Sequence, residues 1–218
     1  MNAQLRTELQ SALTSIGASA PIFLSRAGAD RLFEGFVLSC VIRALRDVGA
    51  TMQVYNGRGR PSTTLNLRRA PGQIYNNPVD VGFILARYQN RLYEIHTDLR
   101  VAGTSKVLHE LDICILDRTH ADNCRSQGVD PNGSKVRFLC ECKCYGKSLP
   151  LRIGREFLGL STEFHARAKT IASNSDNSSI LSLARSHDRI TQFALYPGQQ
   201  VKIKNFIGWL AKELEHAL

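Results

Sequence analysis

Two charged residues, Glu141 and Lys143, lie in a segment that otherwise has the pattern of a buried β-strand, VRFLCECKCY. Side chains two residues apart on a strand point to the same face, so we expect this pair side by side and Cys142 on the opposite face. Asp112 lies about 29 residues earlier in a similar apolar segment, VLHELDICIL. Buried charges are costly unless they pair or bind a metal ion. Oxygen ligands for a hard divalent cation, with an amine beside them, indicate metal-dependent hydrolysis of phosphodiester bonds.

A predicted helix precedes these strands and brings a further carboxylate. Residues 28–48 carry one continuous apolar stripe, and Gly49 is expected to end the helix. Glu34 lies at the edge of the stripe, where its carboxylate can face a sheet.

The remaining segments predict an α/β fold, with a central mixed β-sheet flanked by α-helices. An irregular segment rich in Gly, Pro, Asn and Arg, with short strand-like pieces, occupies about 49–89. Strands are expected at about 91–96, 105–117 and 135–145, followed by a helix (152–167), strand (169–173), helix (177–187), strand (190–197) and helix (about 199–216).

Length and composition favour a single globular domain covering residues 1–218. No run of roughly 20 apolar residues is present, so no membrane contact is expected, and the N-terminus lacks the pattern of a signal peptide. The six cysteines lie mostly in apolar contexts, which is typical of a reducing compartment and predicts a cytoplasmic protein. The formal net charge of +9 favours a polyanionic partner, and nucleic acid is the best candidate.

The order of these elements resembles the PD-(D/E)xK, or restriction-endonuclease-like, nuclease superfamily over residues about 28–175. The resemblance implies a restriction-endonuclease-like core at about 28–196, in which Asp112, Glu141 and the backbone carbonyl of Cys142 hold the metal. Lys143 would orient or activate the attacking water, and Glu34 would be the helix carboxylate. The implied cofactor is Mg²⁺, for which Mn²⁺ substitutes.

One departure from the family pattern concerns the residues around the expected metal ligand. No Pro precedes Asp112, and Glu110 shares its strand face, so the residues leave open which of the two acids is the main ligand. The resemblance favours Asp112.

Six arginines are expected to bind the nucleic-acid backbone. Four belong to the basic, Gly- and Pro-rich segment before the catalytic strands, and two open the helix after the Glu141 strand. These residues are Arg58, Arg60, Arg68, Arg69, Arg152 and Arg155. Solvated arginines that only aid solubility are the alternative for each.

Two other sets of residues are interpreted as core groups. Cys140, Cys142 and Cys144 alternate along a strand, where residues i and i+2 lie about 6.6–6.8 Å apart, whereas thiolates on one tetrahedral zinc ion must converge. His96 and His109 lie in strands, and a lone strand histidine is more often a satisfied core group than a catalyst.

The leading hypothesis is a Mg²⁺-dependent DNA endonuclease, by analogy a component of a defence or mobile-element system. The alternatives are a catalytically silent nuclease-fold module for DNA binding or assembly, and an RNA-directed nuclease. A homodimer or a partner protein of a larger complex is a further expectation, with the C-terminal helix around Trp209 as the contact surface, unless its apolar stripe covers the core.

Overall fold

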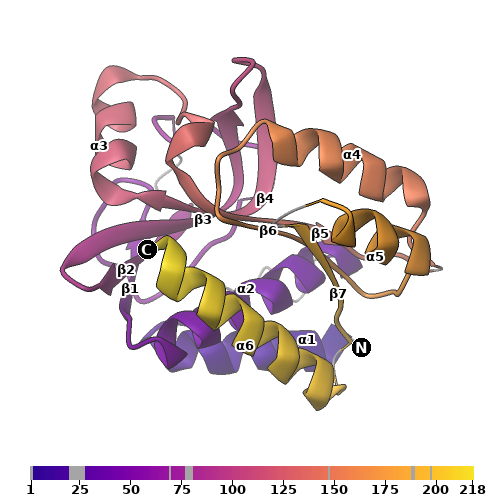
Figure 1. Ribbon diagram of the computed structural model, residues 1–218. Coiled ribbons are helices and arrows are strands. Elements are labelled where there is room, and N and C mark those ends of the chain that lie inside the picture. Colours follow the sequence, from indigo (N-terminus) through magenta and orange to yellow (C-terminus); the bar gives the residue numbers. More distant parts are fainter. Residues whose placement is uncertain are drawn as a thin grey trace.

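The protein is built around a seven-stranded mixed β-sheet whose strands lie in chain order (Figure 1). The computed structural model describes residues 2–19, 28–68, 70–76, 81–146, 148–187, 190–196 and 198–218. Neighbouring strands from β1 to β5 are antiparallel, whereas β6 and β7 run parallel to β5. The strands are β1 (Thr51–Asn56), β2 (Gly82–Tyr88), β3 (Arg91–Ala102), β4 (Leu108–Asp117), β5 (Val136–Lys143), β6 (Ala168–Ser173) and β7 (Ile190–Ala194).

Helices cover both faces of this sheet (Figure 1). One layer consists of α1 (Asn2–Thr14), α2 (Ala29–Asp47) and α6 (Gln200–Ala217). The other layer consists of α3 (Arg118–Gln127), α4 (Leu151–Thr162) and α5 (Ser178–Arg185). The α/β class and the mixed sheet between helices, as expected from the sequence, are confirmed. None of the helices in the described part of the chain is long and apolar enough to cross a membrane.

Each layer has its own hydrophobic core. The α2 core joins α1, α2 and α6 to the sheet and includes Leu9, Phe36, Ile113, Cys140 and Phe206. Cys142 also belongs to the α2 core, in agreement with its interpretation as a core group. The α6 residues Ile203, Phe206, Leu210 and Leu214 are buried, so the apolar stripe of that helix covers the core.

The second core lies under the other three helices. This α4 core includes Leu111, Cys124, Leu139, Phe157 and Ile180. Only two residues of α3, Ala121 and Cys124, are buried. The sequence of α3, RTHADNCRSQ, therefore has no apolar stripe that could have predicted a helix there.

At Asp98, the side chains on one face of strand β3 switch from the α2 core to the α4 core. Ile95 belongs to the α2 core, whereas Leu99 and Val101 belong to the α4 core. Regular alternation would place all three on one face, so the strand must turn over between them. Asp98 has a φ of +47°, a left-handed conformation that Asp tolerates better than most residues.

Strand β4 changes core at the residue opposite Asp98. Thr97 pairs with Ile113, and Leu99 pairs with Leu111, so Asp98 and Asp112 occupy facing positions. Ile113 belongs to the α2 core and Leu111 to the α4 core. Two acidic residues thus meet where both strands turn over.

Candidate metal centre

Asp112 lies where strands β4 and β5 separate. Their pairing ends with Ile113 opposite Cys140, although β5 continues beside β6 as far as Lys143. The backbone N–H of Cys142 donates instead to Oδ2 of Asp112, at 2.7 Å. The Asp112 side chain therefore replaces a backbone acceptor at the point where β4 and β5 stop pairing. This hydrogen bond fixes the carboxylate inside the protein, and Asp112 is only 8% exposed.

Three carboxylates converge at this opening. Glu34 from α2, Asp98 from β3 and Asp112 from β4 each offer an oxygen atom within 4.8 Å of the others. Asp98 is 2% exposed, and no other group in the described part of the chain brings three such ligands together. Hard cations such as Mg²⁺ prefer carboxylate oxygens, so this donor set fits the expected metal.

Lys143 connects the expected catalytic strand to this cluster. Its Nζ lies 2.5 Å from Oε1 of Glu141 and 3.5 Å from Oδ2 of Asp112. The Glu141–Lys143 pair therefore shares a face of β5, as predicted from the spacing of the two residues. Glu141 uses its carboxylate to bind Lys143, and its oxygens do not belong to the converging set of three.

A second cation, Arg31, contacts the other two carboxylates of the cluster. Its Nη1 is 3.1 Å from Oε2 of Glu34, one turn along α2, and it also forms an ion pair with Asp98. Arg31 and Lys143 thus bracket the carboxylates and neutralise part of their charge.

Even with these two cations, the acidic groups are hard to ionise. Burial, together with the charge of Asp98, raises the pKa of Glu34 to about 8. Burial raises the pKa of Asp98 to about 6 in spite of Arg31, and burial and Asp112 raise the pKa of Glu141 to about 7. A bound dication would offset the repulsion between these crowded carboxylates. Its positive charge favours their ionised forms and so lowers their raised pKa values.

Burial works against the charged form of Lys143, but the charges of Glu141 and Asp112 outweigh it and raise the pKa of this lysine. Lys143 is therefore an ammonium group in the metal-free protein. An ammonium donates hydrogen bonds and accepts none, so this state suits orienting a water or a phosphate oxygen rather than taking a proton.

The structure brings together the four residues expected to be catalytic, Glu34, Asp112, Glu141 and Lys143. Glu110, the competing acid, is exposed and lies outside the converging set. Cys142 contacts Asp112 through its backbone N–H. The expected binding of the metal by the Cys142 carbonyl stays a prediction.

Asp98 was missed by the sequence analysis. The signal available was an acidic residue in the middle of the long segment RLYEIHTDLRVA, in which it interrupts an otherwise regular strand. That signal does not distinguish Asp98 from Glu94 in the same strand, because only tertiary contacts decide which acid reaches Asp112.

The expected nucleic-acid-binding arginines occupy different environments. Arg58 and Arg60 are exposed in the turn after β1, and Arg152 and Arg155 are exposed on α4, where Arg152 pairs with Glu156. Their DNA contacts stay predictions. Arg69 lies outside the described residues.

Arg68 differs from the expectation, because it is 4% exposed. Burial lowers the pKa of its guanidinium to about 10. A side chain so placed does not present its charge to a phosphate at the surface, so Arg68 belongs to the interior rather than to a DNA-binding arm.

No protein-family model matches this sequence, and no curated protein matches it.

Proposed function

We propose that this protein is a Mg²⁺-dependent endonuclease with a restriction-endonuclease-like fold that hydrolyses phosphodiester bonds in DNA. The main support is the meeting of Glu34, Asp98 and Asp112 at the opening between β4 and β5, with Lys143 in contact with Asp112. A structural ion-pair network does not account for the whole site. Four carboxylates, those of Glu34, Asp98, Asp112 and Glu141, face only two cations, Arg31 and Lys143, and uncompensated like charges at such distances destabilise the fold.

In this proposal the residues divide the work. Glu34, Asp98 and Asp112 would hold the dication, which would supply Lewis-acid polarisation of the scissile phosphate. Glu141 holds Lys143, and the Lys143 ammonium orients the attacking water against the phosphate. The water oxygen forms the new P–O bond, the bond to the leaving oxygen breaks, and the water proton ends on that leaving group. No residue of the chain becomes covalently attached.

The proposal includes DNA as substrate, the cytoplasm as compartment, and a role in a defence or mobile-element system. The support for a polyanionic substrate is the net charge of +9 together with the exposed arginines of the β1 turn and α4. The cytoplasm is supported by six free cysteines.

The test is incubation of the protein with supercoiled plasmid and linear duplex in Mg²⁺, Mn²⁺, Ca²⁺ or EDTA. Cleavage in Mg²⁺ and Mn²⁺, little in Ca²⁺ and none in EDTA is expected. Binding of duplex without cleavage in any metal would favour the catalytically silent module instead. Cleavage of RNA but not of DNA would reassign the substrate and keep the site.

A further inference from the structure

A pocket lies at the C-terminal end of β4, five residues beyond Asp112 of the acidic cluster (Glu34, Asp98 and Asp112). It has a volume of about 610 Å³ and is formed where α3 begins, beside the start of β3 and the segment leading into β5. Its cationic residues are Arg91, Arg118, Lys135 and Arg137, and its acidic residue is Asp117. The pocket also contains the first turn of α3, which has no acidic residue and no side-chain cap.

The positive charge of this pocket is only partly compensated. Arg137 binds Oδ2 of Asp117 through Nε and Nη2, at 2.9 and 2.7 Å. Arg91 and Lys135 are exposed and form no ion pair within the described part of the chain. His120 also lines the pocket, but burial lowers its pKa and its Nε2 accepts the N–H of Asn132, so it is neutral. An excess of two unpaired cations therefore remains.

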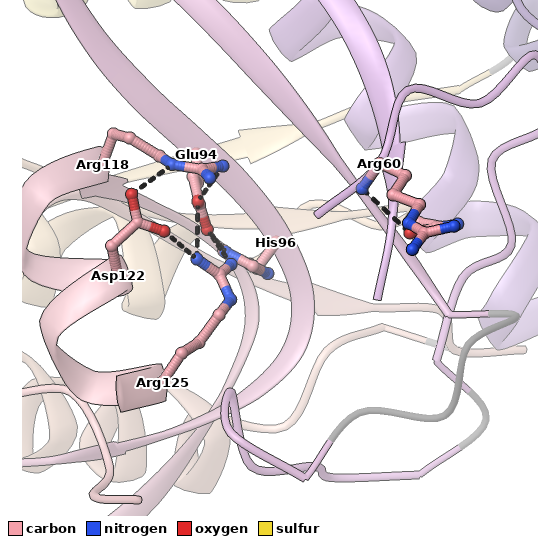
Figure 2. Close-up of polar contacts among 7 residues, drawn as sticks. Arg60, Glu94, His96, Arg118, Asp122 and Arg125 are labelled. Carbon is pink, nitrogen blue, oxygen red and sulfur yellow. Dashed lines mark hydrogen bonds and ion pairs between the residues drawn. The ribbon is translucent and has the colours of Figure 1, made fainter. Parts of the chain in front are cut away.

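A buried ion-pair network holds α3 in place beside the pocket. Figure 2 shows Glu94 on β3 between Arg118 and Arg125, which lie about two turns apart on α3. Glu94 is fully buried, and Arg118 Nη1 lies 2.7 Å from its Oε1, while Arg125 pairs with the same carboxylate.

Burial opposes ionisation of Glu94, but the hydrogen bond from His96 and the charge of Arg125 lower its pKa to about 2. Glu94 is therefore a permanent carboxylate at neutral pH, and it fixes the two arginines of α3. Because Arg118 lines the pocket, one of the pocket's cationic side chains is held in place before any ligand arrives.

The turn after β1 lies close to the pocket. Gly59, between Arg58 and Arg60, is near the guanidinium of Arg118, whose carbon lies 6.0 Å from the centre of the Tyr55 ring on β1. The backbone N–H groups of Arg58 and Arg60 donate to Oδ1 of Asn56, at 3.1 and 3.0 Å (Figure 2 labels Arg60), which holds the turn in shape. The two exposed side chains extend the basic surface beyond the pocket.

The spacing between the pocket and the acidic cluster suits one DNA strand. Asp117 lies five residues after Asp112 on β4, or about 17 Å at roughly 3.4 Å per residue. On β5, Arg137 lies four residues before Glu141, or about 13 Å, at the point where the β4–β5 register shifts. Phosphates of one strand advance about 3.4 Å per nucleotide along the duplex axis and also wind around it, so straight-line distances of this size span about two to three nucleotides.

We propose that the pocket formed by Arg91, Arg118, Lys135 and Arg137 binds a backbone phosphate of duplex DNA about two to three nucleotides from the phosphate at the acidic cluster. This inference rests on the proposed function for its choice of DNA. It assigns the main backbone anchor to the start of α3, rather than to the α4 arginines.

The experiment measures binding of a labelled 20-base-pair duplex by fluorescence anisotropy over a series of salt concentrations, in EDTA. Arg91→Ala/Lys135→Ala removes the two unpaired pocket cations. Each phosphate contact contributes about 0.9 to the slope of log K against log salt, so we expect the slope to flatten by about 1.8. Lys204→Ala/Lys212→Ala is the control, because it removes two exposed lysines from α6 in the opposite helix layer. Its slope should equal that of the unaltered protein.

An unchanged slope in the pocket variant overturns the proposal, as does an equal loss in the control or a failure of the unaltered protein to bind the duplex. Thermal melting checks folding, and if the double variant melts early, Lys135→Ala alone should flatten the slope by about 0.9. Because binding is measured in EDTA, cleavage is not needed. If the pocket variant flattens the slope but the unaltered protein never cuts DNA, the proposed nuclease activity is refuted while the phosphate-binding pocket is supported.

Discussion

Arg31 on α2 and Asp98 on β3 form an ion pair although 67 residues separate them in the sequence. The same guanidinium contacts Glu34, so a side-chain cation already lies against two of the three converging carboxylates. A dication at this site would have to share these oxygens with Arg31 or displace it. Predictions about metal binding therefore concern Arg31 as well as the acids.

Removing Arg31 should tighten metal binding. A unit charge about 6 Å from a dication repels it by several kcal/mol at an effective dielectric constant near 20, so Arg31→Ala should bind Mg²⁺ at least about tenfold more tightly. Calorimetry at pH 9 measures this, because proton competition at Glu34 is then small. Arg43→Ala is the matched control, since Arg43 lies on the same helix and pairs with Glu8, away from the cluster. Weaker binding in Arg31→Ala than in the control would contradict a competing role for Arg31.

Asp98→Asn should weaken Mg²⁺ binding about as much as Asp112→Asn, because each removes a charged oxygen from the same set. A loss of at least about tenfold is expected, since outer-shell partners of metal sites already cost about 10–100-fold. Glu110→Gln, on the same strand as Asp112 but exposed, should change the affinity much less. Equal losses in Glu110→Gln and Asp98→Asn would place the metal elsewhere.

Lys143→Ala should abolish cleavage while leaving folding and DNA binding largely intact. Loss of one positioned catalytic group typically lowers the rate by about 10²–10⁴. A single-turnover assay with saturating protein separates the chemical step from binding. Cutting within threefold of the unaltered protein would end the assignment of Lys143.

The raised pKa of Glu34 predicts that the metal-free protein loses stability as the pH rises. Its carboxyl ionises near pH 4.5 in the unfolded chain but at about 8 in the folded protein. The unfolded state therefore binds fewer protons between these values, and stability falls by up to about 1.4 kcal/mol per pH unit. Glu34→Gln removes this dependence, so urea unfolding in EDTA should show the variant gaining relative stability from pH 5 to pH 8. A difference that stays constant over this range would show that Glu34 titrates normally.

The Glu94 network should be a major source of stability. Glu94→Gln leaves Arg118 and Arg125 without their buried anion, and breaking a buried pair typically costs about 3–5 kcal/mol. Asp122→Asn removes an exposed partner of the same arginines and should cost no more than about 1 kcal/mol. Chemical denaturation of both variants compares these values, and similar small losses would mean that the buried charge is not needed.

Local patterns in the sequence were sufficient for the elements that carry long apolar repeats. The helix expected at 28–48 is α2, the strands with Asp112 and Glu141 are β4 and β5, and the alternation from α4 to α6 was expected in the right order. These elements bury a continuous face, so their periodicity is visible without any knowledge of their neighbours. The spacing of Glu141 and Lys143 also follows from strand geometry alone.

The tertiary structure decided the features that depend on contacts between distant residues. Strands β1 and β2 lie in a segment rich in Gly and Pro, and they pair because the sheet supplies partners for their backbone groups. Helix α3 is polar on most of its surface and is held by Glu94, which is distant in sequence. In the sequence Arg68 resembles Arg58 and Arg60, which are exposed, yet the fold buries Arg68.

The acidic cluster shows the same division. The sequence by itself placed Asp112, Glu141 and Lys143 on two strands and Glu34 at the edge of a helix. It did not indicate Asp98, because the left-handed residue that turns β3 over has no periodic signal. Only the register of β3 against β4 sets Asp98 opposite Asp112, and only the packing of α2 brings Glu34 and Arg31 to them. A local pattern fixes the direction of a side chain, whereas the meeting of side chains depends on pairing and packing across the whole chain.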